Sequence, residues 1–199
     1  MTPILTQPEL DGMAKQERLA PNPPDKTGHV YQRDCRIPLI VRRCLEQCDG
    51  DLIEIGTYLG GTTAVLVDLA RRYNRKVICL DNFQGGDDWK LDEIGMQFKA
   101  KLSGWRDVVE FHEIDAHTDE ARRLIQSRRY AWAMSDDGHS KEAHVHELLS
   151  LMPVVNCGIL VDDVYHPGVR EAIEEVLPKF PGWTWLQSPG LAEDWLVKQ

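Results

Sequence analysis

Five short apolar runs alternate with helix-like patterns, and this alternation restricts the fold more than any other feature of the chain. The runs cover residues 52–55, 76–80, 108–114, 130–134 and 158–161, and the helical patterns that follow them cover 62–73, 91–102, 118–127, 141–151 and 168–180. Strands that are joined through helices run parallel, and their helices cover both faces of the sheet. We therefore predict an α/β protein with a doubly wound, mostly parallel sheet.

Two more apolar runs complete this sheet at the C-terminal end. Residues 183–187 and 194–198 flank Ser188-Pro189-Gly190, which predicts an antiparallel hairpin and a seven-stranded sheet in all. A further helical pattern over 32–48 ends at Asp49-Gly50. The expected sheet and its helices thus fall within a single domain over residues 31–199.

The first thirty residues differ in composition from the rest. They are polar and rich in proline, as in PNPPDKTG at 21–28. Proline fixes φ and disfavours helix interiors, so we expect an N-terminal arm or lid over 1–30, with a disordered tail as the alternative.

The charge balance excludes several classes of partner. The formal net charge is −9, and nucleic acids and anionic membranes attract basic surfaces. No run approaches the ~18 apolar residues of a membrane span, and the first residues do not resemble a signal peptide. We expect a soluble cytoplasmic protein that binds neither nucleic acid nor membrane.

The cysteines indicate a reduced protein. There are five, an odd number, and none forms a C-x-x-C pair. Cys44 and Cys48 are four residues apart on an expected helix, where a buried thiol acts as a small apolar group. We expect free thiols and an intracellular location.

The turn after the first strand reads EIGTYLGGTT over residues 54–63. No lysine follows its glycines, so it is not a P-loop. Its E-x-G-x-x-x-G spacing also differs from the G-x-G-x-x-G of dinucleotide sites, and an acid there repels pyrophosphate but suits an ammonium group. The alternative is a tight turn without a ligand. Cofactor contacts are expected at Glu54, Gly56, Thr57, Tyr58, Gly60 and Thr62.

Acidic residues recur where the strands end. The five are Glu54, Asp81, Asp115, Asp136 and Asp162. Ligands of parallel sheets bind beyond the carboxyl ends of the strands, and an acid after the second strand accepts ribose hydroxyls. A ligand with a ribose and a cationic tail but no phosphate is S-adenosylmethionine (SAM). Asp115 and Ala116 are expected near its adenine, with further contacts at Asn82, Phe83 and Asp136.

Four motifs resemble known methyltransferases. The glycine turn resembles motif I of class I SAM-dependent methyltransferases. DNFQG at 81–85 resembles the D-[ST]-F-x-G element of the macrocin O-methyltransferase-like family. DDGHS at 136–140 and GILVDD at 158–163 resemble the D-G-D-H-[ST] and G-G-x-[IV]-x-x-D-D elements of related small-molecule methyltransferases and cephalosporin-hydroxylase-like proteins. Two departures stand out: Asp137-Gly138 replaces Gly-Asp, and Cys157 replaces a glycine.

This resemblance implies an O-methyltransferase that acts on a hydroxyl of a small molecule, of sugar or natural-product type. It implies a divalent cation such as Mg²⁺ at Asp136, Asp162 and Asp163, lowering the pKa of an acceptor hydroxyl. The alternative is that Asp162 and Asp163 only cap the next helix. His139 is the first candidate for a general base and His166 the second.

Other functions stay open at this point. A metal-dependent hydroxylase of the cephalosporin-hydroxylase-like kind would use two histidines and one carboxylate, and Asp136, His139 and His166 imitate that set. A SAM-binding regulatory module without turnover is the third hypothesis. The loop at Gly85–Trp89 reads as a substrate lid or as an exposed loop, and a homodimer is left open.

Overall fold

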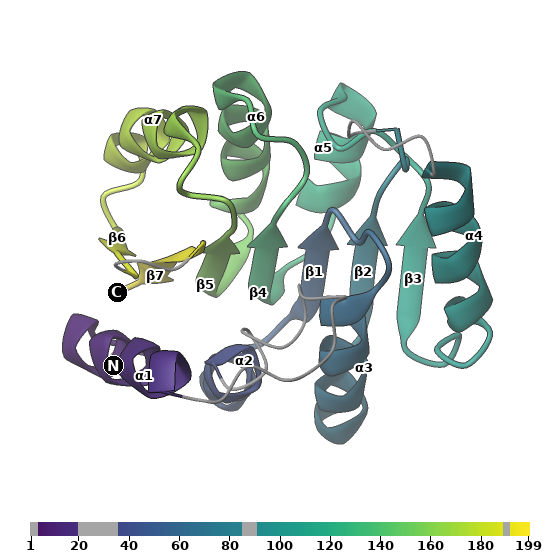
Figure 1. Cartoon of the computed structure of the whole chain (residues 1–199), viewed down its shortest axis with the longest axis horizontal. Coiled ribbons are helices and arrows are strands. Elements are labelled where there is room, and N and C mark those ends of the chain that lie inside the picture. Colours follow the sequence, from purple (N-terminus) through teal and green to yellow (C-terminus); the bar gives the residue numbers. More distant parts are fainter. Residues whose placement is uncertain (1–3, 20–35, 85–90, 189–191) are drawn as a thin grey trace.

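Seven strands form one mixed sheet in the computed structural model, which describes residues 4–19, 36–84, 91–188 and 192–199 (Figure 1). The strand order is β3-β2-β1-β4-β5-β7-β6. Strands β1 to β5 are parallel, and β7 pairs antiparallel with both β5 and β6. The predicted fold class is confirmed. The strands are β1 Asp51–Ile55, β2 Val77–Leu80, β3 Val109–His112, β4 Tyr130–Ser135, β5 Val155–Val161, β6 Trp183–Leu186 and β7 Asp194–Lys198.

Helices cover both faces of the sheet. One apolar cluster takes buried side chains from α1 to α4, and a second takes them from α5 to α7. The helices are α1 Gln7–Leu19, α2 Arg36–Gln47, α3 Gly61–Tyr73, α4 Leu91–Leu102, α5 Asp119–Gln126, α6 Lys141–Leu151 and α7 Pro167–Val176, followed by a 3-10 turn at Leu177–Lys179. None of these helices is long and apolar enough to cross a bilayer.

Helix α1 was not predicted. Residues 7–19 are polar on average, but Ile4, Leu5 and Leu10 are buried and join the cluster on the α2 face. Three apolar anchors in a polar segment give little periodic signal, which is why the sequence indicated an arm. The proline-rich stretch 21–28 lies outside the described residues.

Two strands differ from expectation by more than one residue at an end. Strand β5 begins at Val155 rather than at residue 158. The predicted start was too late because the polar Asn156 interrupts the apolar run. The Asn156 Nδ2 donates to the carbonyl of Asp49 at 2.8 Å, so its amide is satisfied at the start of the strand. Strand β3 is shorter than predicted and ends at His112.

The cysteine prediction was wrong for one pair. Cys48, just after α2, is joined by a disulfide to Cys157 on β5, with a Cα–Cα distance of 6.3 Å. The two residues are 109 positions apart in the chain, so no local spacing pointed to the pair. Cys44 and Cys79 are free and buried, and burial raises the pKa of each thiol.

The parallel strands end in register. Ile55 pairs with Leu80 on one side and Ser135 on the other, and Ser135 pairs with Val161. The strand order reverses direction between β1 and β4, which is where ligands bind in open α/β sheets. The loops after β1, β2, β4 and β5 therefore meet at one edge, above the arrowheads in Figure 1.

Candidate functional site

Three of the five predicted acids directly follow their strands. Asp81 follows β2, Asp136 follows β4, and Asp162 follows β5. The backbone hydrogen bonds of the sheet extend to these three acids. The amides of Asp81, Asp136 and Asp162 donate to the carbonyls of residues 112, 55 and 135, in that order. The other two acids lie elsewhere: Glu54 is inside β1, and Asp115 comes three residues after the end of β3.

Glu54 points into the protein rather than onto the rim. Its side chain is on the face of β1 toward α3, and the residue is only 1% exposed. The hydroxyl of Thr63 in α3 donates to Glu54 Oε2 at 2.6 Å, and the Cys79 thiol lies 3.8 Å from the same oxygen. Side chains alternate along a strand, so an acid one residue before the end faces the helix layer. Glu54 therefore lies inside the strand rather than beyond its end, and its contact with a cofactor stays a prediction.

Asp81 holds the glycine turn in place. Its Oδ2 accepts from the backbone amides of Thr57 at 2.7 Å and Tyr58 at 2.9 Å, and from the Thr57 hydroxyl at 3.1 Å. Its Oδ1 accepts from the amide of Phe83 at 2.7 Å. In dinucleotide sites the amides of this turn face a pyrophosphate. Here a carboxylate occupies them, so the turn repels phosphate.

The two turn glycines make room for the chain itself. A Cβ on Gly56 would lie 2.1 Å from the carbonyl oxygen of Asp136, and one on Gly60 would lie 2.9 Å from the ring of Phe98. Both glycines have positive φ, +81° and +74°. Gly56 thus lets the loops after β1 and β4 touch, which brings Asp136 beside the turn.

A polar network that was not predicted lies between the loops after β3 and β4. His117 Nδ1 is 3.1 Å from Asp115 Oδ1, and His117 Nε2 is 3.1 Å from both Glu147 Oε1 and the carbonyl oxygen of Asp137. Glu147 on α6 is fully buried and accepts from the Ser135 hydroxyl at 2.6 Å. The hydrogen bond to Glu147 raises the pKa of His117 to about 9. The network ties Asp115 to α6.

Asp137 adds a further carboxyl group to this side of the rim. Burial, followed by the charge of Glu147, raises the pKa of Asp137 to about 7. Asp81 and Asp115 also raise this pKa, whereas His117 lowers it. Carboxylates that perturb one another in this way favour a cationic ligand.

We predict that replacing Glu147 by Gln lowers the pKa of His117, because the neutral amide no longer favours the imidazolium. NMR titration of the His117 ring should give a midpoint near pH 9 in the wild type and a lower one in Glu147→Gln. The contribution of the His117–Glu147 pair to the free energy of unfolding is complete below the unfolded pKa of about 6.5. It is lost as the pH rises through about 9.

Glu142→Gln, on the same helix but exposed, is the matched control and should leave the His117 midpoint unchanged. A wild-type midpoint near 6.5 would contradict the Glu147 contact.

The predicted metal ligands are together. Asp136, Asp162 and Asp163, called the acid triad below, offer carboxylate oxygens within 4.8 Å of one another. Hard oxygen donors of this kind fit Mg²⁺. Asp163 has a left-handed backbone with φ of 54°, and Tyr58 and Phe83 on the neighbouring loops share this feature. Strained residues of this kind cluster at functional sites.

Both candidate bases lie beside the acid triad. His139 Nε2 is 2.6 Å from Asp163 Oδ2, and its ring stacks on that of His166 with a centroid distance of 4.5 Å. A second group of potential ligands consists of His139, Asp163 and His166. The predicted set of two histidines and one acid is therefore present with Asp163 in the position expected for Asp136.

The remaining predicted cofactor residues lie around the same loops. Tyr58 is half exposed, and Ala116 is buried. Asn82 Oδ1 accepts from the amide of Gln84 at 2.9 Å. The Phe83 ring packs on Phe98 and Phe111, and Thr62 is in the first turn of α3. Contact of these residues with a cofactor stays a prediction, and the proposed lid at 85–89 falls outside the described residues.

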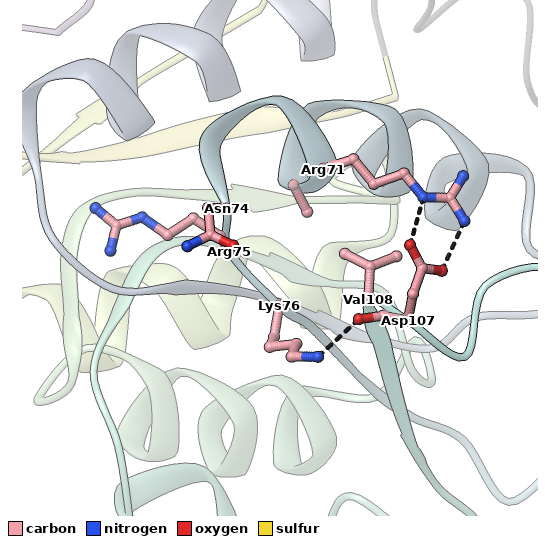
Figure 2. A pocket seen from close by; sticks show the side chains of 7 residues that line it. Arg71, Asn74, Arg75, Lys76, Asp107 and Val108 are labelled. Atoms are coloured by element: carbon pink, nitrogen blue, oxygen red, sulfur yellow. Dashed lines mark hydrogen bonds and ion pairs between the residues drawn. The ribbon is translucent and has the colours of Figure 1, made fainter.

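A pocket at the opposite edge of the sheet offers no comparable chemistry. It lies where α3 ends and β2 and β3 begin, and Figure 2 shows its lining. Arg71 forms a bidentate pair with Asp107, and Lys76 Nζ donates to the Asp107 carbonyl at 2.7 Å. Because these cations already have partners, we assign the pocket no ligand.

The sequence motifs did not single out His117 or Glu147. The available signal was position: His117 stands two residues after the rim acid Asp115. Glu147 is far from any rim motif in sequence, and only the packing of α6 on β4 brings it there.

Comparisons with known proteins agree with this geometry. Residues 53–164, more than half of the chain, match the family model described as a methyltransferase domain. A search of curated protein sequences found no match.

Solved structures share the fold at low identity. The TDP-rhamnose 3'-O-methyltransferase CalS11 of calicheamicin biosynthesis is 16% identical over 97% of this chain and 95% of its own, with a TM-score of 0.63. The cofactor-bound protein Rv0187 from MTB is 17% identical over 97% and 90%, with a TM-score of 0.65. A putative caffeoyl-CoA O-methyltransferase from Staphylococcus aureus is 15% identical over 96% and 92%, with a TM-score of 0.58.

Proposed function

Because this chain belongs to the methyltransferase-domain family, we propose that it methylates a hydroxyl group of a small molecule with SAM as the methyl donor. The main observation in support is that the backbone amides of the glycine turn donate to the carboxylate of Asp81. The negative charge of this site repels a pyrophosphate and attracts the positively charged sulfonium and ammonium groups of SAM.

The residues for SAM divide by location. The turn 56–60 and Asp81 would hold the amino-acid tail and ribose, and Asp115, fixed by His117, would lie on the adenine side. Asp81 already accepts four hydrogen bonds, so a ribose hydroxyl would share its remaining lone pair. The acidic neighbours of Asp137 favour the positive charge of SAM.

When bound, SAM supplies an electrophilic methyl group on a sulfonium sulfur. His139 would accept the proton of the acceptor hydroxyl on its ring nitrogen while the oxygen–methyl bond forms and the sulfur–methyl bond breaks, giving a methyl ether and S-adenosylhomocysteine. His139 contacts Asp163 through Nε2, and this carboxylate would stabilise the imidazolium that forms. Alignment of oxygen, methyl and sulfur provides much of the rate.

A divalent cation is part of the proposal. The acid triad would hold it, and the cation would supply a Lewis acid that lowers the pKa of the acceptor hydroxyl. Asp163 contributes both to this set and to the contact with His139, so the base and the cation would be next to each other.

The acceptor is proposed to be a sugar or a related natural product. The exposed Tyr165 packs against His166 with a ring distance of 4.4 Å and an angle of 38° between the rings, and His166 stacks on His139. This row of rings borders the acid triad and offers flat surfaces for a ring-shaped acceptor. CalS11, a TDP-rhamnose 3'-O-methyltransferase, supports the same class of acceptor.

Calorimetric titration with SAM and with S-adenosylhomocysteine tests the cofactor first. Binding in the micromolar range is expected for both, and no heat at millimolar ligand would refute the proposal. A panel of sugars, nucleotide sugars and phenols, followed by mass spectrometry for a gain of one methyl group, then identifies the acceptor. Binding without transfer to any acceptor would favour the regulatory module.

We predict that Asp162→Asn separates the metal from the cofactor. Asp162 is 2% exposed, and loss of its charge should weaken Mg²⁺ binding at least about 10-fold and abolish chelator-sensitive transfer. SAM affinity should change by less than about 3-fold, because the turn and Asp81 are untouched. If a chelator does not change the rate of methyl transfer by the wild type, the proposed metal requirement is refuted, but the proposed methyltransferase activity is not.

A further inference from the structure

A second set of metal-ligand atoms lies beside the acid triad and differs from it in chemistry. His139, Asp163 and His166 each offer one ligand atom, all within 4.8 Å of one another. This set, called the histidine set below, has two imidazole nitrogens and one carboxylate oxygen, whereas the acid triad has oxygens alone. Only Asp163 is common to both.

We propose that the histidine set binds a divalent late first-row transition metal such as Co²⁺ or Zn²⁺, at a position separate from that of Mg²⁺. Imidazole nitrogen suits these metals, while Mg²⁺ prefers oxygen ligands in octahedral geometry. Two nitrogens and one carboxylate are a common protein ligand set for Zn²⁺ and leave a coordination position for water.

The loop after β5 holds two of the three ligands at a fixed spacing. The amide of His166 donates to the carbonyl of Asp163 at 2.9 Å, which closes a turn. His166 is also the residue that precedes the first turn of α7, yet its side chain makes no capping hydrogen bond. Its ring is therefore not used to cap the start of the helix.

The third ligand comes from the loop after β4, and Gly168 lets the two loops approach. A Cβ on Gly168 would lie 2.8 Å from the backbone nitrogen of Lys141 and 3.1 Å from the carbonyl oxygen of His139. Any other residue there would push α7 away from His139. The close approach thus brings His139 over His166.

One ring must turn for both nitrogens to reach the same ion. The two rings are nearly parallel, at 8°, and an imidazole lone pair lies in the plane of its ring. The His139 side chain is 56% exposed, so it is free to rotate. Its contact with Asp163 would then be replaced by bonds from both residues to the metal. Asp136 and Asp162 would add negative charge nearby.

Occupancy of the histidine set would stop the methyl transfer, because a metal-bound His139 has no lone pair for the acceptor proton. This consequence rests on the proposed function, whereas the site itself does not. The predicted behaviour is inhibition by Zn²⁺ or Co²⁺ in the presence of Mg²⁺.

Cobalt absorption tests the site without SAM or acceptor. The untagged full-length protein is titrated with Co²⁺ in a large excess of Mg²⁺, and the visible absorption of protein-bound Co²⁺ is followed. We expect one Co²⁺ per chain, displaced by Zn²⁺. His166→Ala should weaken Co²⁺ binding at least about 100-fold, and His139→Gln, at an exposed position, should do the same. His112→Ala, a histidine at the β3 side of the sheet, is the matched control and should bind as the wild type does.

Three results would overturn the site: wild-type affinity in both His166→Ala and His139→Gln, displacement of Co²⁺ by Mg²⁺, or a loss in Asp162→Asn as large as that in His166→Ala. SAM calorimetry on the same preparations keeps the two proposals apart. A protein that binds SAM but not Co²⁺ refutes the histidine set alone. One that binds Co²⁺ but not SAM refutes the methyltransferase alone.

Discussion

Gly56→Ala is expected to cost more than about 4 kcal/mol of unfolding free energy, a loss that few single substitutions reach. The added Cβ would lie 2.1 Å from the carbonyl oxygen of Asp136 and 2.6 Å from its carbonyl carbon. Both are backbone atoms, so no side-chain rotation relieves the overlap. The backbone of Gly56 also has φ of +81°, which is costly for alanine.

The overlap cannot be relieved cheaply, because both partners are fixed by the sheet. The Gly56 amide donates to the carbonyl of Leu80, and the Asp136 amide donates to the carbonyl of Ile55. Separating the two loops therefore breaks the ladder at the centre of the sheet. A typical domain has 5–15 kcal/mol of stability in total, so we expect a large fall in the urea midpoint or loss of soluble protein.

Gly182→Ala is the matched control for this substitution. A Cβ there meets no atom within 4 Å, and the residue has no left-handed backbone angle. Its free energy of unfolding should stay within about 0.5 kcal/mol of the wild type. A Gly56→Ala protein as stable as Gly182→Ala would show that the loops after β1 and β4 do not touch as described.

The sheet could be predicted from the sequence because each strand is indicated by residues that are close together in the chain. Each of the five parallel strands is a short apolar run bounded by polar residues, and the helices between them leave few topologies. The exceptions have local causes. Asn156 interrupts the apolar run of β5, and α1 has too few apolar residues to show a helical period.

The site was predictable only where it depends on position after a strand. Asp81, Asp136 and Asp162 follow strands directly and lie on the rim as expected. Glu54 lies one residue before the end of β1, which the sequence also placed at residue 55, and its side chain contacts Thr63 of α3. The alternation of side chains along a strand therefore decides whether an acid near the strand end faces the rim.

Contacts between distant segments were out of reach. The pair Cys48–Cys157 and the contact between His117 and Glu147 each join residues brought together only by packing. The contact of Gly56 with the loop after β4 was also not predicted: a glycine in a turn signals a close approach, but the sequence does not say whether a ligand or the chain approaches. Here the chain does.

Asp81→Asn is expected to weaken SAM binding about 100-fold, equivalent to about 2.7 kcal/mol, and to remain folded. The carboxylate accepts from three backbone amides, those of Thr57, Tyr58 and Phe83, on its two oxygens. An asparagine of the same shape has one oxygen and one NH₂ group. Whichever way it is turned, the NH₂ group faces at least one backbone N–H, and donor faces donor.

The loss should fall on binding more than on stability. Asp81 is 7% exposed, so a backbone N–H left without an acceptor in Asp81→Asn lowers the free energy of unfolding by about 1–3 kcal/mol. A domain of this size tolerates that loss. The turn 56–60 would lose its anchor, however, and the negative charge that favours the cationic cofactor would be gone. SAM and S-adenosylhomocysteine should differ here: the sulfonium ligand should lose more affinity than its neutral-sulfur product.

Calorimetry with both ligands measures this difference, and Asp107→Asn provides the matched control. Asp107 also accepts charge-assisted hydrogen bonds, from Arg71, but it is exposed and lies at the opposite edge of the sheet. Its replacement should leave both affinities unchanged. If Asp81→Asn binds SAM as tightly as Asp107→Asn does, Asp81 serves the fold of the turn alone, and the cofactor site must be sought elsewhere on the rim.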